Sequence, residues 1–275
     1  MEQIKNKIQS LWIGDSLSPI EILSINSFIK NQYQFDLYCY DPISNVPAGV
    51  NLKDANEIIP REEVFIAHNS YAIFADYFRS LLLYHNGGTW VDTDVVCLRR
   101  FDFDENEVII GYQEEGEVVC NAVLGFPARS ILGQKILQRC EKPWVYGRPE
   151  EIEAFEQLNG VSTMELLEKE GEKYLMRYFH VNSPWGAIAG PIGVTTIIKD
   201  LNFADKVKPS TYFYPVSYQQ WWSLFYDNSI DHIVDFSNSY AVHLWRECVR
   251  GYSYFNKSAF QHGSFTQKLW RQYCE

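Results

Sequence analysis

The chain has 275 residues, of which 46% are hydrophobic and 21% are charged, and its formal net charge is −11. This length can fill one substantial α/β core and does not demand two, so we expect a single domain over residues 1–275. The acidic balance argues against nucleic acid as a partner, because surfaces that bind nucleic acid are rich in lysine and arginine.

Strand-like and helix-like patterns alternate along the first half of the chain. Leu11–Ile13 and Phe35–Tyr40 are apolar runs typical of strands, and the spacing of apolar residues predicts a helix near Pro19–Asn31. Such alternation predicts an α/β fold in which helices flank a mixed, mostly parallel sheet. In sheets of this kind, nucleotides bind at the carboxyl ends of the strands.

The pattern after residue 68 predicts a long helix. Asn69 or Ser70 can cap its start, and Gly87 and Gly88 can end it, since glycine adopts a positive φ at little cost. Helical spacing gives this helix a buried face of Ala72, Ile73, Ala75, Phe78, Leu81 and Leu82.

The residues that follow carry the strongest functional signal. Thr89–Val91 is typical of a strand that Val95–Val96 continues, so Asp92 and Asp94 would share one face of it while Thr93 points away. Two hard oxygen donors on one face suit Mg²⁺ or Mn²⁺, and these ions usually complete their coordination with phosphate oxygens of a substrate.

Each of these signals also has a simpler explanation. A lone Asp-x-Asp is common in surface loops, and Asp76 and Arg79, neighbours on the predicted helix, could form a plain salt bridge worth about 0.3–0.5 kcal/mol. Acids directly behind an apolar strand are nevertheless costly, because an unpaired buried carboxylate is destabilising. A bound cation would remove that cost, so the combination favours a metal site that holds a diphosphate.

The segment DYFRSLLLYHNGGTWVDTDV at residues 76–95 resembles the DXD-containing glycosyltransferases of family 32, which include yeast mannosyltransferases and α1,4-galactosyltransferases. Its spacing is also similar to that of the glucosyltransferase domain of large clostridial toxins. Weaker matches extend the resemblance from residue 8 to residue 245: IQSLWIGDSLSP, Cys120–Ala122 with Gly125–Phe126, Gly190–Pro191, Phe213–Pro215 and Ala241–Trp245.

The resemblance implies a GT-A-type nucleotide-sugar-binding fold. Residues 1 to about 110 would form the nucleotide-sugar-binding half, and residues from about 111 to 275 the acceptor half. The second half contains strand-like Val108–Tyr112 and Val123–Phe126, and helix-like Pro149–Asn159 and Val161–Glu172.

The resemblance also implies a set of metal ligands. Asp94 would bind Mn²⁺ or Mg²⁺ directly, and Asp92 would contact both the ribose and the metal. His243 would be a third ligand through a neutral imidazole nitrogen, with a histidine of the core as the alternative. The toxins carry no histidine at this place, so the metal prediction depends mainly on Asp94.

The implied donor is a UDP-sugar. Trp12 would stack on the uracil ring, Asp76 and Arg79 would hydrogen-bond the sugar hydroxyls, and Asn121 would lie near the sugar. The expected catalytic residues are therefore Asp76, Arg79 and Asn121, and the expected donor-binding residues are Trp12, Asp76, Arg79, Asp92 and Asp94.

These assignments predict a metal-dependent, retaining glycosyltransferase that moves a sugar from a UDP-sugar to a glycan acceptor, including a lipid-linked one. The amide of Asn121 is a poor nucleophile, which favours a same-face mechanism in which a UDP oxygen takes the acceptor proton. We expect a role in bacterial capsule or O-antigen polysaccharide synthesis. Two alternatives stay open: an effector-type glycosyltransferase acting on a protein, and a non-catalytic nucleotide-binding module.

The six cysteines show neither a Cys-x-x-Cys pair nor a zinc spacing. The sequence also shows no signal peptide and no membrane-spanning run. Together these features predict a reduced, cytoplasmic protein of bacterial type.

Two aromatic segments have open interpretations. Residues 241–275 mix basic and aromatic side chains, which suits peripheral contact with the inner face of an anionic membrane, and packing on the core is the alternative. Within Tyr212–Tyr226, Trp221 and Trp222 could stack on an acceptor sugar or fill the core.

Overall fold

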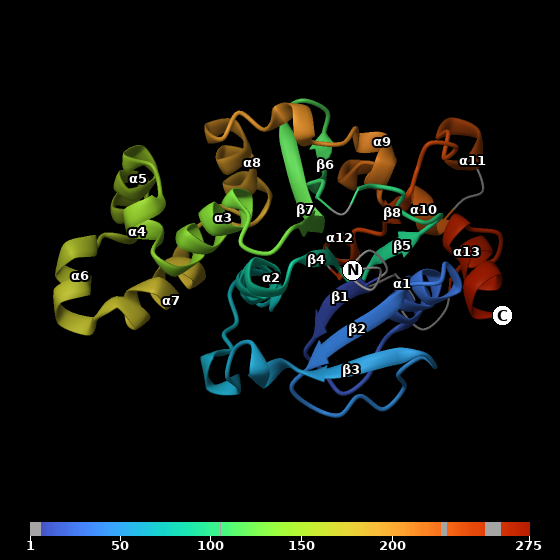
Figure 1. Ribbon diagram of the computed structural model, residues 1–275, viewed down its shortest axis with the longest axis horizontal. Helices are drawn as coiled ribbons and strands as arrows, with labels where there is room; N and C mark the ends of the chain where they lie inside the picture. The colour runs from blue at the N-terminus through green and yellow to red at the C-terminus, as the bar shows by residue number, and fades with distance from the viewer. Residues whose placement is uncertain (1–6, 105, 227–229, 251–259) are drawn as a thin grey trace.

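The computed structural model describes residues 7–104, 106–226, 230–250 and 260–275 (Figure 1). Its main sheet has six strands in the order β3-β2-β1-β4-β7-β6, and a second sheet pairs β5 with β8. The strands are β1 (Lys7–Trp12), β2 (Gln34–Cys39), β3 (Val50–Asp54), β4 (Gly88–Val91), β5 (Val95–Cys97), β6 (Ile109–Glu114), β7 (Val118–Phe126) and β8 (Ala241–His243).

The main sheet is mixed. β1, β2, β3 and β4 are parallel, whereas β7 pairs antiparallel with both β4 and β6. The predicted mixed, mostly parallel sheet flanked by helices is therefore confirmed. The carboxyl ends of β1 and β4 lie at the same edge of the sheet, where the sequence predicts a ligand site.

The helices vary from one turn to four. The α-helices are α1 (Pro19–Lys30), α2 (Ala72–Asn86), α3 (Ile131–Glu141), α4 (Pro143–Tyr146), α5 (Pro149–Asn159), α6 (Thr163–Glu170), α7 (Glu172–Asn182), α8 (Pro191–Asp200), α9 (Ser210–Phe213), α10 (Ser223–Tyr226), α11 (Ile230–Ile233), α12 (Arg246–Arg250) and α13 (Phe265–Cys274). Short 3₁₀ turns are η1 (Ala55–Glu57), η2 (Arg61–Glu63), η3 (Ala204–Lys206) and η4 (Tyr218–Gln220).

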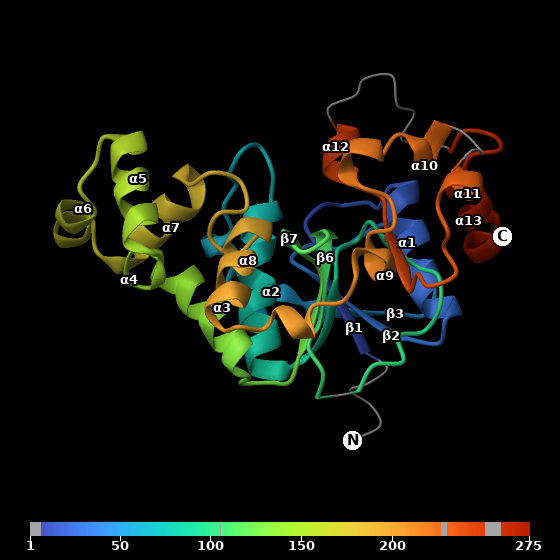
Figure 2. The same ribbon diagram turned by 90° about the horizontal axis from the view of Figure 1, so that it is seen from above.

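Helices cover both faces of the sheet, and each face has its own hydrophobic core (Figure 2). On one face α2, α3 and α8 bury residues such as Phe78 and Leu82 against Trp90 of β4. On the other face α1, α13 and the small β5–β8 sheet bury residues such as Phe28. β1 and β4 contribute residues to both cores, so hydrophobic packing on both faces of the sheet supports the edge where these strands end.

The sequence signals at helix ends work as expected, with one shift. α2 ends at Gly87, which has a φ of 64°, and a Cβ there would lie 2.7 Å from the backbone nitrogen of Ala128. A side chain at this position would collide with the backbone that follows β7. The helix begins at Ala72, two to three residues later than the predicted caps, and Ser70 Oγ accepts the Ala72 N–H at 3.2 Å.

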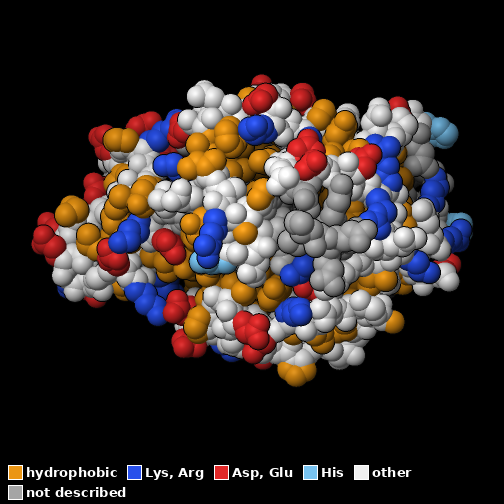
Figure 3. Space-filling model, viewed as in Figure 1, with side chains coloured by type: hydrophobic (Ala, Val, Ile, Leu, Met, Phe, Trp, Pro, Cys, Tyr) orange, Lys and Arg blue, Asp and Glu red, His pale blue; other side chains and the backbone are white. Residues whose placement is uncertain are grey.

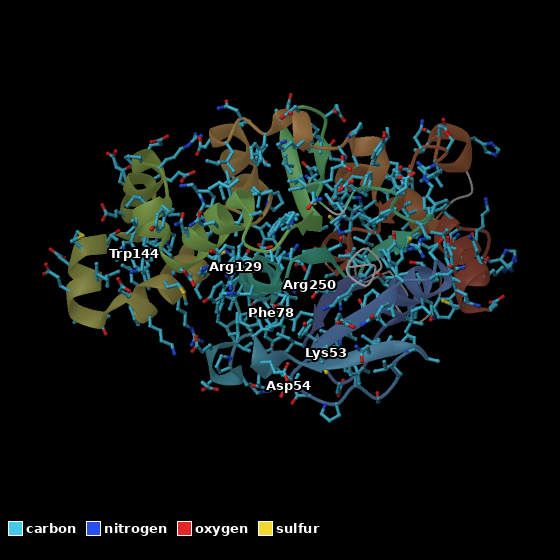
Figure 4. The ribbon with its side chains drawn as sticks, viewed as in Figure 1. Lys53, Asp54, Phe78, Arg129, Trp144 and Arg250 are labelled. Carbon is cyan, nitrogen blue, oxygen red and sulfur yellow. The ribbon has the colours of Figure 1, made fainter. Side chains whose placement is uncertain are left out.

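Helices α4 to α7 form a lobe that projects beyond the sheet (Figures 1 and 2). Stacked rings of Phe155 and Phe179, 3.9 Å apart, and the nearby ring of Trp144 fill its interior (Figure 4). Acidic and basic side chains are interspersed over its surface (Figure 3), as in the ion pair of Lys142 with Glu172. The acidic clusters of this region are thus solvated faces.

The described part of the carboxyl terminus packs on the core. Phe265, Leu269 and Tyr273 of α13 are buried, and Trp270 packs against the same cluster. These side chains therefore contribute to the core, while Tyr252, Tyr254 and Phe255 lie outside the described residues. Among the helices that the structure describes, none is both long and apolar enough to cross a membrane. All six cysteines are free thiols.

The buried His180 of α7 makes stability depend on pH. Burial lowers the pKa of His180 from 6.5 to about 4, while Nε2 bonds the Cys140 carbonyl at 2.9 Å. The unfolded chain therefore binds a proton at higher pH than the native protein. The stability of the native protein is therefore greatest above the pKa of the histidine in the unfolded chain, and it decreases as the pH falls toward the lower pKa of His180 in the native protein.

We expect the unfolding free energy attributable to His180 to fall by about 2 kcal/mol between about pH 7 and about pH 5. Other groups with shifted pKa values, Asp76 among them, titrate alike in both proteins, so urea unfolding should show a change that is less favourable by about 2 kcal/mol in the wild type than in His180→Leu. The exposed His85 offers a control, and His85→Leu should keep the wild-type dependence. An equal loss in wild type and His180→Leu would contradict the prediction.

Candidate active site

The Asp-x-Asp motif lies in a turn at the carboxyl end of β4. The Val95 N–H closes the turn on the Asp92 carbonyl at 3.0 Å, and the Asp92 N–H donates to the Ala122 carbonyl at 2.8 Å. The prediction of one continuous strand through the motif is wrong, because β4 ends at Val91 and β5 begins at Val95 in the second sheet. The backbone changes pairing partner at the acids, so it turns there.

The small sheet brings His243 to this turn. β5 pairs antiparallel with β8, and the register places Val95 opposite His243. His243 Nε2 consequently lies 3.1 Å from Asp94 Oδ2. One potential ligand atom from each of Asp92, Asp94 and His243 lies within 4.8 Å of the others. The three predicted metal ligands therefore come together in space.

Trp245 and Arg246 support Asp94 from the other side. Trp245 has a left-handed φ of 54°, and its indole N–H donates to the Val216 carbonyl at 2.9 Å. Such a backbone is strained for a bulky residue and persists where the surroundings hold it. The resulting turn lets the Arg246 N–H donate to Asp94 Oδ2 at 2.8 Å.

Arg79 of α2 lies between two carboxylates and is almost fully buried. Its Nη2 is 3.0 Å from Asp76 Oδ1, and its Nη1 is 3.1 Å from Asp92 Oδ1. Nη1 also donates to the Asn121 carbonyl at 2.6 Å, and the guanidinium lies 5.1 Å from the Trp90 ring centre. Arg79 thus fixes the helix acid and the motif acid relative to each other.

Asn121 of β7 belongs to the same network. Its Nδ2 donates to Asp76 Oδ1 at 2.8 Å and to the Ala189 carbonyl at 2.8 Å. Both amide hydrogens are used in these bonds, so the side-chain oxygen is the atom that Asn121 can present to a ligand.

Burial and neighbouring charges set the pKa values of the three acids. Burial raises the pKa of Asp76 to about 6, against the lowering effect of Arg79. Burial likewise raises the pKa of Asp92, again opposed by Arg79. For Asp94, burial acts in the raising direction, but His243 and the Arg246 N–H outweigh it and the pKa is lowered. Asp94 is therefore the acid best suited to act as an anionic ligand.

Trp12, at the end of β1, contacts an arginine from the carboxyl-terminal part of the chain. The Arg246 guanidinium carbon lies 5.1 Å from the centre of the Trp12 ring. Arg246 Nε is 2.5 Å from Oε1 of the buried Glu21, whose other oxygen accepts the Ser18 N–H at 2.6 Å. Burial raises the pKa of Glu21, while Arg246 lowers it.

A cavity of about 850 Å³ opens over this network, within the range typical of ligand pockets. Its lining includes every residue that the sequence predicts for the site: Trp12, Asp76, Arg79, Asp92, Asp94, Asn121 and His243. Neither Trp221 nor Trp222 lines it, because Trp221 fills the core and Trp222 is exposed elsewhere. Of the two alternatives that the sequence leaves open, Trp221 therefore takes the core position, and neither residue lies on the cavity wall.

Sequence reasoning missed several members of the site. Trp90 was predicted only as a strand residue, yet its indole N–H donates to Asp92 Oδ1 at 2.7 Å. Arg246 directly follows the His-x-Trp element, which was the only available signal for it. Glu21 stands three residues after Ser18, a spacing that indicates a helix cap and gives no hint of Arg246.

Two protein-family models match the chain. Residues 19–114 match the glycosyltransferase sugar-binding region containing DXD motif, and residues 199–275 match the alpha 1,4-glycosyltransferase conserved region. The chain is a glycosyltransferase. The predicted DXD-containing sugar-binding region is confirmed, and the two matched regions meet at the cavity through Asp94 and His243. The sheet order and the DXD match agree with the GT-A-type fold expected from the sequence.

Solved glycosyltransferase structures are similar to this one at low identity. The PaToxG glycosyltransferase is 19% identical, with 72% of this chain and 87% of that chain covered and a TM-score of 0.40. The UDP-bound glycosyltransferase domain from the YGT toxin is 10% identical, with 98% of this chain and 89% of that chain covered and a TM-score of 0.49. The WbbM bifunctional glycosyltransferase is 12% identical, with 98% of this chain and 52% of that chain covered and a TM-score of 0.34. No curated protein sequence matches the chain.

The Arg79 network yields a stability prediction. Arg79→Ala leaves Asp76 and Asp92 buried without their counter-charge, so we expect unfolding free energy to fall by about 3–5 kcal/mol. The exposed pair of Arg61 with Asp41 is a matched control, and Arg61→Ala should cost less than about 1 kcal/mol. Urea unfolding of both variants measures the difference. Similar losses in the two would show that Arg79 is not the central support of these acids.

Proposed function

We propose that this glycosyltransferase moves a sugar from a UDP-sugar to a glycan hydroxyl with the help of a divalent metal, and that it retains the anomeric configuration. The observation that carries the proposal is the meeting of Asp92, Asp94 and His243 at one cavity. Asp76 and Asn121 line the same cavity beside them.

The donor set fits a divalent metal. Asp92 Oδ1 is occupied by Arg79 and Trp90, and Asp94 Oδ2 by His243 and the Arg246 N–H. Within the described part of the chain, the second oxygen of each carboxylate makes no hydrogen bond, which leaves one hard oxygen per acid for an ion. Two such oxygens suit Mn²⁺ or Mg²⁺. His243 Nε2 now contacts Asp94 Oδ2, and it would ligate the ion by exchanging that contact for the metal, which would favour Mn²⁺ over Mg²⁺. The bound ion would neutralise charge on the departing diphosphate.

Trp12 would receive the uracil ring. It ends β1 at the edge where nucleotides bind in such sheets, and its ring is already held by the Arg246 guanidinium. A planar ring on this cavity wall gives a base an apolar face to stack on.

Asp76 and Asn121 would orient the donor sugar. Asp76 Oδ1 is used by Arg79 and Asn121, so its other oxygen can accept a sugar hydroxyl. The Asn121 side-chain oxygen can do the same. In this proposal Arg79 acts mainly by holding Asp76 and Asp92 in place, since both of its Nη atoms bond protein oxygens.

In this proposal the anomeric configuration is retained without a covalent intermediate, because the residues beside the sugar are poor nucleophiles. Asn121 is a poor nucleophile, and Asp76 is tied to Arg79 and Asn121. We therefore favour a same-face reaction in which the acceptor hydroxyl attacks as the bond to UDP breaks, and a UDP oxygen takes its proton. The match of residues 199–275 to an alpha 1,4-glycosyltransferase region supports an α-linked product.

The wider role is also part of the proposal. We place the enzyme in bacterial surface polysaccharide synthesis and in the cytoplasm, with residues 1–110 as the donor half and 111–275 as the acceptor half of one domain. Peripheral membrane contact stays a prediction from the sequence alone. Transfer to a protein acceptor is the alternative that an acceptor screen would reveal.

The first prediction concerns Asp94. In a panel of UDP-sugars with Mn²⁺, we expect slow UDP release from one donor, removed by EDTA and reduced at least about 100-fold in Asp94→Asn. Asp205→Asn changes an exposed acid far from the motif in sequence and should behave as wild type. Release that survives both EDTA and Asp94→Asn would overturn the metal-dependent mechanism.

The second prediction concerns His243. If it is a ligand, His243→Ala should weaken Mn²⁺ binding about 10–100-fold, with UDP release restored at high Mn²⁺. Electron paramagnetic resonance of free Mn²⁺ measures the binding directly. A histidine that only fills the core would give a less stable protein with unchanged Mn²⁺ affinity.

A further inference from the structure

The loop between α7 and α8, residues 183–190, carries an exposed tryptophan to the cavity. Trp185 is 39% exposed and lines the cavity together with Tyr71 and Ile192, which are 38% and 54% exposed. A large aromatic side chain left in water forgoes favourable burial. One side of the ring lies near the His68 ring, with 6.0 Å between the ring centres, and the exposed part is available to a ligand in the cavity.

The loop is braced along its length, so Trp185 is held in place. At its start, His68 Nε2 bonds the Ser183 carbonyl at 3.0 Å. Further on, Arg139 Nε and Nη2 donate to the carbonyls of Ile188 and Ala187 at 2.8 and 2.9 Å. Arg139 is itself buried and paired with Glu151 at 2.8 Å.

The segment that faces this loop is strained. His68 and Asn69 have left-handed φ values of 50° and 58°. Backbone strain of this kind persists only where the surroundings fix it, and it gathers at functional sites. The Asn69 carbonyl accepts a bond of 2.7 Å from Arg250, which Figure 4 labels near the centre of the molecule. Hydrogen bonds thus fix both the loop at residues 183–190 and the facing segment at residues 68–69.

The loop reaches the residues that we assign to the donor sugar. Asn121, which bonds Asp76, also bonds the Ala189 carbonyl, four residues after Trp185. At Gly190 a Cβ would lie 3.0 Å from Asp76 Oδ2 and 2.5 Å from the Gly186 Cα. Only a residue without a side chain allows this approach, so the Trp185 loop ends against the predicted position of the transferred sugar.

We propose that Trp185 is the platform of an acceptor subsite, on which the C–H face of an uncharged pyranose stacks. This inference rests on the proposed function and names the acceptor class for the same cavity. Glu114 and Gln113 line the cavity and form no side-chain hydrogen bond to other described residues, so they can accept and donate bonds to sugar hydroxyls.

The charges of the cavity favour a neutral acceptor. Its lining contains three arginines, and each is already paired: Arg79 with Asp76 and Asp92, Arg246 with Glu21, and Arg250 with Glu247. A phosphate or carboxylate on the acceptor ring would meet no free cation among the described lining residues. An aromatic platform beside amide and carboxylate groups is the arrangement that an uncharged sugar ring requires.

The first experiment separates donor use from acceptor use. UDP release without acceptor, and transfer to methyl pyranosides and to lactose, maltose and cellobiose, are measured for wild type, Trp185→Ala, Trp185→Phe and Trp222→Ala. We expect Trp185→Ala to raise acceptor KM about tenfold or more with UDP release unchanged, and Trp185→Phe to restore most of the affinity. Trp222→Ala removes a more exposed ring outside the cavity and should match wild type.

The second experiment measures binding without turnover. Saturation-transfer NMR on protein with UDP and diamagnetic Mg²⁺ should show the ring protons of the best saccharide close to the wild-type protein, and this signal should vanish in Trp185→Ala. Unchanged acceptor KM in Trp185→Ala, or no pyranoside bound by the wild type, would overturn the inference. Failure of the proposed function looks different, since no UDP-sugar would then be hydrolysed by any variant.

Discussion

The site depends on one buried guanidinium. Arg79 contacts Asp76 from its own helix, Asp92 from the turn after β4 and the Asn121 carbonyl from β7, so a single side chain ties three elements together. Two acids so near each other would repel without it, and burial would protonate them. With Arg79 between them, one acid can face a sugar while the other faces a metal. The rest of the cavity is arranged around that fixed pair.

The sequence predicts which residues gather at the cavity, because part of their arrangement is local. Asp76 and Arg79 are neighbours on a helix, and Asp92 and Asp94 follow an apolar strand, so spacing alone brings each pair together. The family resemblance then adds Trp12, Asn121 and His243, and all seven residues line one cavity. Helix ends are also readable, since Gly87 and Pro191 stand where a helix stops or starts.

Other features lie beyond sequence reasoning for physical reasons. Apolar residues on both sides of the motif look like one strand. The residues of β8 that pair with β5 lie 144 to 148 positions further along the chain, and this pairing redirects the backbone after Asp92. Support from main-chain groups leaves no pattern, as in the Arg246 N–H on Asp94 and the Ala189 carbonyl on Asn121. The aromatic segment around Trp221 left two interpretations open for a similar reason, because composition does not say which rings face inward. Trp185, isolated in the sequence, gave no periodic signal.

The joint between the two sheets limits how this protein can be divided. Asp94 lies in the turn between β4 of the main sheet and β5 of the small sheet, while His243 and the Arg246 N–H that hold its carboxylate come from the other end of the chain. A fragment that stops before β8 would keep the whole DXD motif and lose both partners. It would also lose the strand that pairs with β5. Such a fragment would still match the family by its DXD sequence, but it would lack the contacts that hold the Asp94 carboxylate in position.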